Sequence, residues 1–197
     1  MTDSVAPQLE PLARLAESVA DASIRTVVLV EGRSDQAAVE AVAERCGLDP
    51  AASGFLVAPM QGASNLGRFL DFLGSIDLRV LVLGDAAEAP GMHRCLAGAG
   101  VPESALYVCV PDLEAELIAA LGADRVQELV VENGDGRAFR SLQRQPEWRD
   151  RPLEDQLRRF FGSGSGRKLR YARVLAGQLT RERMPKPLRD VVRTLEN

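Results

Sequence analysis

Four short apolar segments, each followed by a helix pattern, constrain the fold of this chain more than any other feature of its sequence. The segments are rich in valine and leucine and lie at residues 26–30, 54–58, 79–83 and 105–110. Strands that are apolar along their whole length are buried on both faces, as happens when helices connect parallel strands. The sequence therefore predicts an α/β fold with a parallel sheet of about four strands and helices on both faces.

Apolar residues at helical spacing predict helices before, between and after these strands. The expected helices are at 9–20, 36–45, 64–73, 93–99, 113–121, 123–132, 139–145, 153–161, 168–179 and 187–195. No strand pattern follows residue 121. We therefore divide the chain into a leading helix in 1–24, an α/β core in 25–121 and a basic helical C-terminal region in 122–197 that packs on the core.

Acidic and basic side chains are separated along the chain. Residues 1–136 contain 21 Asp and Glu against 8 Arg, whereas residues 137–197 contain 7 Asp and Glu against 16 Arg and Lys. A basic region of this kind either binds phosphates of a nucleic acid or offsets the charge of the acidic body. Positions three and four apart share a helix face. The candidate nucleic-acid-binding residues are Arg158, Arg159, Arg167 and Arg170.

The counts of histidine and cysteine exclude several classes of protein. His93 is the single histidine, so a Ser-His-Asp triad or a multi-histidine metal site is not expected. Cys46, Cys95 and Cys109 form no Cys-x-x-Cys pair and leave one cysteine over, which fits the reduced cytoplasm better than a secreted disulfide framework. The apolar runs are of strand length, so we expect no membrane segment.

Carboxylates follow three of the four predicted strands, at the point where each strand ends. Ligands of parallel α/β sheets bind outside these carboxyl ends. Clustered carboxylates repel one another, and a divalent cation relieves the repulsion. Oxygen ligands without histidine or cysteine favour Mg²⁺ or Mn²⁺ over zinc. The residues concerned are Glu31, Asp35, Asp85, Glu88, Asp112, Glu114 and Glu116.

Some of these carboxylates also have a purely structural explanation. Asp35 suits the first turn of a helix that has Ser34 as its N-cap, and Glu114 suits a solvated helix face. Glu31 is harder to explain in this way, because it directly follows four β-forming residues, where an unpaired carboxylate is costly. Asp85 has the same position after the third strand. Taken together, the acids favour a metal site.

Three motifs resemble those of a known domain family. They are Val-Glu-Gly-Arg-Ser-Asp at residues 30–35, Asp85 after the third strand and Leu-Glu at residues 113–114 after the fourth. They resemble the Toprim domain of type IA and II topoisomerases, bacterial primases and the OLD (overcoming lysogenization defect) nucleases. The Leu-Glu pair and the lysine in a helical C-terminal region are most similar to the OLD branch. The resemblance covers residues 25–121, and more loosely the chain to about residue 190. It implies a Toprim-like (Rossmann-like) fold and Mg²⁺-dependent phosphodiester chemistry.

The resemblance also implies roles for individual residues. Glu31 corresponds to the invariant, catalytic Toprim glutamate and Asp35 to a metal ligand or a residue that supports one. Asp85 corresponds to the first aspartate of the Asp-x-Asp motif, and Glu114 to a later acidic ligand. Lys168 follows a glycine-rich turn, at a place similar to the lysine that OLD nucleases use beside the scissile phosphate. The alternative for Lys168 is a solvated lysine at a helix start.

The chain departs from the family pattern in two respects. Ala87 occupies the second acidic position of the Asp-x-Asp motif, and Glu88 is the nearest substitute. Either Glu88 reaches back to the metal or one ligand is missing. OLD nucleases also usually carry an N-terminal ATPase, whereas residues 162–168 do not have the P-loop pattern and do not follow a strand. We therefore expect a stand-alone Toprim protein or one half of a split system with a separately encoded ATPase partner.

The leading functional hypothesis is a Mg²⁺- or Mn²⁺-dependent endonuclease, in which Glu31, Asp85 and Glu114 hold the metal. The expected substrate is nucleic acid, with DNA preferred. The alternative is a degenerate, non-cutting Toprim module that binds nucleic acid or a partner protein, which the substitution at Ala87 favours. A third hypothesis is phosphatase- or nucleotidyltransferase-like action on a small phosphorylated ligand. The sequence predicts no particular oligomeric state.

Overall fold

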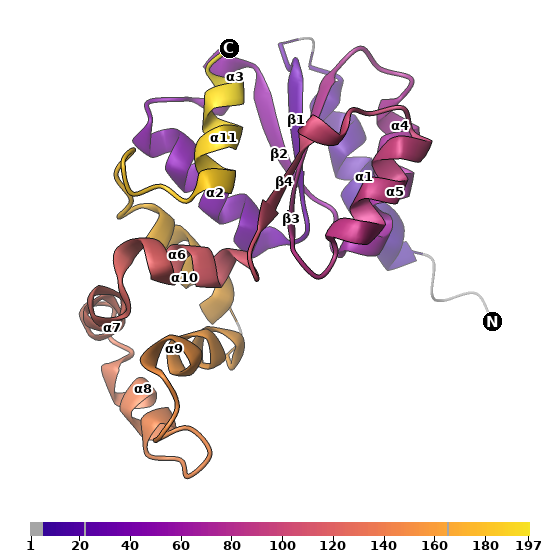
Figure 1. Ribbon diagram of the computed structural model, residues 1–197. Coiled ribbons are helices and arrows are strands. Elements are labelled where there is room, and N and C mark those ends of the chain that lie inside the picture. Colours follow the sequence, from indigo (N-terminus) through magenta and orange to yellow (C-terminus); the bar gives the residue numbers. More distant parts are fainter. Residues whose placement is uncertain (1–5, 22, 165) are drawn as a thin grey trace, which may run out of the picture.

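A computed structural model describes residues 6–21, 23–164 and 166–197. In these residues one sheet has the strand order β2-β1-β3-β4, and every pair of neighbouring strands is parallel (Figure 1). The predicted strands agree with the observed ones to within two residues, which confirms the α/β fold. The strands are β1 (Thr26–Val30), β2 (Phe55–Pro59), β3 (Arg79–Asp85) and β4 (Leu106–Cys109).

Helices cover both faces of the sheet, as predicted (Figure 1). Successive side chains of a strand point to opposite faces. Val28 and Val30 of β1 accordingly belong to one buried cluster with α2, α10 and α11, and Val27 and Leu29 to another with α1, α4 and α5. The helices are α2 (Arg33–Arg45), α10 (Arg167–Ala176) and α11 (Lys186–Leu195) on one face, and α1 (Ala6–Val19), α4 (Leu66–Leu73) and α5 (Ala89–Gly98) on the other.

The order of the strands reverses direction at β1. The chain runs from β1 outward to β2, then returns to place β3 on the other side of β1, followed by β4. In open α/β sheets the connections that follow the two strands at such a reversal run in opposite directions. The carboxyl ends of these two strands line a crevice. The carboxyl ends of β1 and β3 are therefore where a ligand site is expected.

The helices after β4 form a lobe beside the sheet (Figure 1). Side chains of this lobe and of α10 and α11 share one buried cluster with β1, β3 and α2. The domain boundaries at residues 24 and 121 stay predictions. The first five residues of the predicted leading segment, Ala22, and Ser165 of the glycine-serine turn lie outside the described residues. The lobe helices are α6 (Leu113–Leu121), α7 (Ala123–Glu132), α8 (Gly136–Gln143) and α9 (Leu153–Gly162).

Short helical segments were not predicted. The α-helix α3 (Pro50–Ser53) has only four residues, and the 3-10 helices η1 (Ala63–Asn65) and η2 (Glu103–Ala105) have three each. Segments of this length are too short to show a helical repeat of apolar residues. None of the described helices is long and apolar enough to cross a membrane.

Four aromatic side chains form the core of the lobe and join it to α10. Phe139 and Phe160 meet edge to face with ring centroids 5.1 Å apart, and Phe161 stacks on Tyr171 at 4.7 Å. All four are buried. Phe160, Phe161 and Tyr171 are therefore core residues, as predicted, and offer no surface on which a base could stack.

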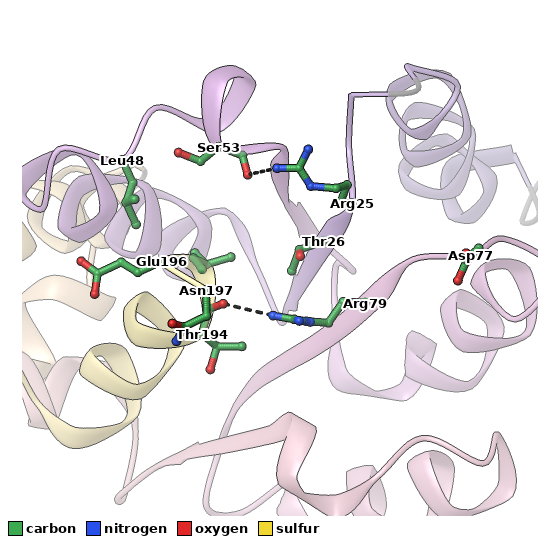
Figure 2. A pocket seen from close by; sticks show the side chains of 10 residues that line it. Arg25, Thr26, Leu48, Ser53, Asp77, Arg79, Thr194, Glu196 and Asn197 are labelled. Carbon is green, nitrogen blue, oxygen red and sulfur yellow. Dashed lines mark hydrogen bonds between the residues drawn. The ribbon is translucent and has the colours of Figure 1, made fainter.

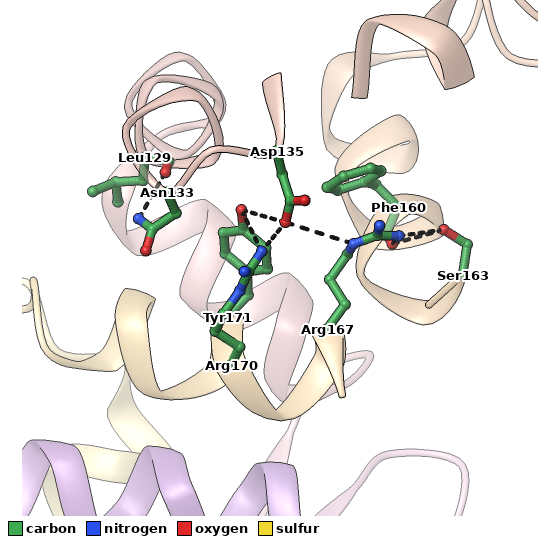
Figure 3. A network of polar contacts seen from close by, with 8 residues as sticks. All are labelled: Leu129, Asn133, Asp135, Phe160, Ser163, Arg167, Arg170 and Tyr171. Carbon is green, nitrogen blue, oxygen red and sulfur yellow. Dashed lines mark hydrogen bonds and ion pairs between the residues drawn. The ribbon is translucent and has the colours of Figure 1, made fainter. Parts of the chain in front are cut away.

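Asp135 holds a polar network above this aromatic core (Figure 3). It forms an ion pair with Arg170, lies 3.7 Å from Arg167 Nε and accepts a hydrogen bond of 3.0 Å from the Tyr171 hydroxyl. Arg167 also lies over the Phe160 ring, at 4.0 Å from its centroid. Asp135 thereby links the start of α8 to the first turns of α10.

We expect Asp135→Asn to lower the free energy of unfolding by about 1–2 kcal/mol, because it removes the charge on which three partners converge. Urea denaturation of the full chain measures this loss. Asp150→Asn is the matched control, since the Asp150 side chain is 85% exposed and pairs only with the adjacent Arg149. Equal stability of the two variants would contradict a stabilising role of Asp135.

Candidate functional site

Glu31 and Asp85 lie at the carboxyl ends of the two central strands. Glu31 directly follows β1, and Asp85 is the last residue of β3. The strands are neighbours, and Val30 is in register with Leu83. Glu31 is held by its main chain, because its carbonyl accepts a hydrogen bond of 3.0 Å from the Gly62 amide. The two carboxylates thus occupy the point where the strand order reverses.

Asp35 supports the turn that carries Glu31. Its Oδ2 accepts a hydrogen bond of 2.8 Å from the Gly32 amide. Gly32, in extended backbone, is the N-cap of α2, so the prediction of Ser34 as N-cap is wrong. The helix begins three residues before the predicted start, and Ser34 is a buried residue of its first turn. The structural explanation for Asp35 therefore holds in part. Its carboxylate stabilises the start of α2, from a position three residues after the N-cap.

Asp85 connects the end of β3 to the start of α6. Its Oδ1 accepts a hydrogen bond of 3.2 Å from the Leu113 amide. The N-cap of α6 is Asp112, which accepts a hydrogen bond of 2.8 Å from the Ala115 amide and forms an ion pair with Arg158. The sequence contained a signal for this cap, since Asp directly before an apolar helical run is a common N-cap.

Glu114 and Lys168 form an ion pair between α6 and α10. Lys168 Nζ lies 3.2 Å from Glu114 Oε1, and only 13% of the Glu114 side chain is exposed. The alternative of a solvated helix face for Glu114 is therefore wrong. Glu116, one residue further along, is half-buried and accepts a hydrogen bond of 3.1 Å from the Val110 amide.

The buried carboxylates of this site are under-neutralised, because the nearby positive charge does not balance their negative charge. Burial raises the pKa of Asp35 to about 6, against the attraction of Lys168. Burial likewise raises the pKa of Asp85 to about 6, and the negative charges of Asp35, Asp112 and Glu31 add to the effect. The pKa of Glu114 is also raised by burial, although Lys168 opposes this. We call Glu31, Asp35, Asp85 and Glu114 the strand-end cluster.

Lys168 supplies the positive charge at this cluster. Burial acts to lower its pKa, but Glu114, Asp35 and Asp85 outweigh burial and raise it. The ammonium group therefore stays protonated at neutral pH. Four of the five predicted metal ligands are thus electrostatic neighbours: Lys168 acts on Glu114, Asp35 and Asp85, and Glu31 acts on Asp35 and Asp85.

The donor chemistry of the strand-end cluster fits a hard divalent cation. All its members are carboxylates, and two of them have a pKa raised to about 6 by burial and by neighbouring negative charge. Within the described residues, however, no three acidic, histidine or cysteine side chains stand close enough together to hold a metal ion. The structure therefore shows donors of the right type gathered at one edge without an assembled set of three.

Glu88, the fifth predicted ligand, follows Asp85 in a tight turn, and its amide donates a hydrogen bond of 3.0 Å to the Asp85 carbonyl. It is exposed at the N-cap position of α5, beside a pocket that Ser64 and Arg94 also line. Ala87 is exposed as well.

The four candidate arginines do not present one common free face. Arg158 pairs with Asp112, and both Arg167 and Arg170 engage Asp135 (Figure 3). Arg159 is exposed, with its guanidinium 5.8 Å from the centroid of the Trp148 ring. Sequence analysis missed these partners, because the pairs join residues far apart in the chain. The nucleic-acid-binding role of the arginines stays a prediction.

The raised pKa values predict how stability depends on pH. Because the pKa of Asp35 and Asp85 is about 6 in the folded state and 3.8 in the reference state, the folded protein binds more protons between these values. The contribution of these groups to stability is therefore full below about pH 4, falls as the pH rises to about 6 and is constant above it. We expect Asp85→Asn to reduce this fall by about 1 kcal/mol, after allowance for solvent screening.

Urea denaturation between pH 4 and pH 8 in the presence of a chelator measures the effect. Asp71→Asn is the control, because Asp71 is an exposed residue of α4, away from the cluster. The same pH dependence in Asp85→Asn and wild type would contradict the placement of Asp85 in an under-neutralised site.

Comparison with known proteins shows which domain model and which solved structures this chain resembles. Residues 24–86 match the family model of the overcoming lysogenization defect protein-like TOPRIM domain. The structure is similar to the C-terminal region of the Burkholderia pseudomallei OLD protein, with a TM-score of 0.65 and 18% identity over 88% of this chain and 97% of that one. It is also similar to the C-terminal region of the Xanthomonas campestris pv. campestris OLD protein, with a TM-score of 0.64 and 24% identity over 87% of this chain and 94% of that one.

No curated protein sequence matches the chain significantly. The motif at residues 30–35 and Asp85 lie within the matched range, whereas Glu114 and Lys168 lie beyond it. The structural similarity extends over most of the chain and so includes the helical C-terminal region. Residues 24–86 thus match the TOPRIM domain model of OLD-like proteins, and the chain as a whole has the fold of the C-terminal region of OLD proteins.

Proposed function

We propose that this protein is a Mg²⁺- or Mn²⁺-dependent endonuclease that hydrolyses phosphodiester bonds of nucleic acid, with DNA as its substrate. The observation that carries the proposal is the gathering of carboxylates and Lys168 at the point where the strand order reverses. The match of residues 24–86 to a Toprim domain model supports it, since Toprim domains generally bind divalent metal ions.

Glu31, Asp35 and Asp85 would hold the metal, with Glu114 as a further carboxylate. When bound, the cation would supply activation of water and neutralisation of charge on the phosphate. The turn of Gly32 fixes Asp35, and the Leu113 amide fixes Asp85, so both carboxylates are held before any ligand arrives. Fixed donors of this kind lower the cost of reorganisation during the reaction.

Lys168 would stabilise the charge that develops on the scissile phosphate. Its ammonium group is anchored by Glu114 at 3.2 Å, while about half of its side chain is exposed. An anchored but accessible cation beside a carboxylate site is suited to contact a phosphate oxygen. This supports a role in the reaction rather than that of a solvated lysine.

Cleavage of supercoiled plasmid by the wild type tests the proposal. We expect weak nicking with Mn²⁺ or Mg²⁺ and none with a chelator, and loss of nicking in Glu31→Gln. Asp71→Asn should cleave like the wild type. Nicking that persists in Glu31→Gln would point to a contaminating nuclease, and absence of nicking in every metal would argue for the second candidate function.

The second candidate is a non-cutting module that binds nucleic acid or a partner protein, such as a separately encoded ATPase. The exposed Ala87 in the second Asp-x-Asp position and the exposure of Glu88 favour it. Ala87→Asp distinguishes the two, because it should raise metal affinity or cleavage where a ligand is merely missing. If Ala87→Asp lowers both and Glu88→Ala abolishes them, Glu88 is the native ligand.

A further inference from the structure

A cavity of about 670 Å³ lies at the edge of the sheet opposite the strand-end cluster (Figure 2). It is lined by the residues where β1 and β3 begin, by Ser53 at the end of α3 and by residues 194–197 at the end of α11. Two exposed arginines, Arg25 and Arg79, are among the residues that line it. We call it the arginine cavity.

The two arginines are held next to each other by the sheet itself. Arg79 is in register with Thr26, and its amide donates a hydrogen bond of 2.9 Å to the Arg25 carbonyl. Arg25 directly precedes β1, so it is one residue before the register partner of Arg79. The start of β3 thus places the Arg79 backbone next to that of Arg25.

Within the described residues, most of the donors of these guanidinium groups have no hydrogen-bond partner in the protein. Arg25 Nη2 donates a hydrogen bond of 3.4 Å to the Ser53 carbonyl, and Arg79 Nη1 one of 3.3 Å to the Thr194 carbonyl. Each guanidinium has five N–H donors. In the described part of the chain no carboxylate lies within ion-pair distance of either arginine.

The acidic residues that line the cavity do not neutralise the arginines. Figure 2 shows the Arg25 guanidinium pointing toward Ser53 and the Arg79 guanidinium pointing toward the end of α11, and both pointing away from Asp77. The Glu196 carboxylate is paired with Arg181 at 2.6 Å. The cavity is therefore a concave site with two available positive groups.

We propose that the arginine cavity binds a small phosphate-bearing ligand through Arg25 and Arg79. The planar guanidinium fork matches the oxygens of a phosphate, and two such groups can bind one phosphate from two sides. The volume is in the range of pockets that enclose small ligands. The ligand is distinct from the substrate of the proposed function, because the cavity lies at the amino ends of the strands and the carboxylates lie at the carboxyl ends.

Calorimetric titration of the full chain tests this proposal. The probes are inorganic phosphate, pyrophosphate and a deoxymononucleotide, at constant ionic strength in chloride. We expect Arg25→Gln and Arg79→Gln each to weaken binding of the best probe by about tenfold or more, because each removes a charge-assisted hydrogen bond. Arg68→Gln is the matched control, an exposed arginine on α4 that removes the same charge elsewhere.

Asp85→Asn separates this proposal from the proposed function. Probe binding that is unchanged in Asp85→Asn supports an independent site, whereas binding lost in that variant would place the phosphate at the carboxylates. Failure of all three probes to bind the wild type would overturn the proposal, as would an equal loss in Arg68→Gln. If the protein bound a short oligonucleotide but none of the three probes, the proposal would be overturned and the cavity would be part of a nucleic-acid-binding surface. If a Gln variant does not fold, Arg25→Lys or Arg79→Lys takes its place in the titration. Lysine keeps the positive charge but lacks the planar guanidinium group that matches two phosphate oxygens.

Discussion

Asp85→Asn is expected to lower metal-dependent cleavage of DNA by about 10²–10³-fold while it raises the melting temperature of the metal-free protein. A neutral amide holds a divalent cation far less well than a carboxylate, so the proposed metal chemistry is lost. The amide oxygen can still accept the hydrogen bond from the Leu113 amide, so the link from β3 to α6 persists.

The gain in stability has a separate cause. Burial and the charges of Asp35 and Asp112 raise the pKa of Asp85 to about 6, so the ionised side chain is disfavoured in the folded state at neutral pH. Asparagine removes that cost. Opposite effects on activity and stability are typical of residues kept for function at the expense of stability.

Thermal melts in a chelator and single-turnover cleavage in Mn²⁺ measure the two effects on the same variant. Asp71→Asn should change neither. A variant that loses both activity and stability would show that Asp85 has a structural role only. A variant that keeps its activity would exclude Asp85 from the reaction.

Lys168→Ala is expected to lower the single-turnover rate of cleavage by about 10²-fold and to change DNA affinity only slightly. A group that stabilises charge in the transition state affects the rate more than the binding of the ground state. The anchoring of Lys168 by Glu114 places its charge beside Asp35 and Asp85, where the reaction is proposed to occur.

Lys186→Ala is the matched control for this prediction. Lys186 is the only other lysine of the chain, its side chain is 79% exposed, and it pairs with Asp190 on α11. Fluorescence anisotropy gives the affinity and rapid mixing gives the rate. Equal cleavage rates in Lys168→Ala and Lys186→Ala would contradict this role. They would favour the alternative that Lys168 is a solvated lysine at a helix start.

The fold could be predicted closely because its strands are apolar throughout and its helices show a clear repeat. The Val27–Val30 run, for example, is completely buried, and no other element type accounts for so short an apolar segment between turns. The proximity of Glu31 and Asp85 follows from the same pattern, because the ends of parallel strands meet at one edge. The start of α2 was placed late, because its first turn is polar and begins at the glycine cap.

Contacts between distant segments could not be predicted. The ion pair of Lys168 with Glu114 depends on how α10 packs against α6, and no local pattern encodes that packing. The same holds for Asp135, whose partners Arg167 and Arg170 were predicted as nucleic-acid contacts from their helix face alone. The adjacency of Arg25 and Arg79 required the register of β1 and β3.

The central claim is that the strand-end cluster binds a divalent cation. Calorimetric titration of Mn²⁺ into the metal-free protein at neutral pH tests it most directly. We predict saturable binding by the wild type and by Asp71→Asn, and loss of that binding in Glu31→Gln and Asp85→Asn. Absence of saturable binding in the wild type, or equal affinity in all four proteins, would contradict the claim.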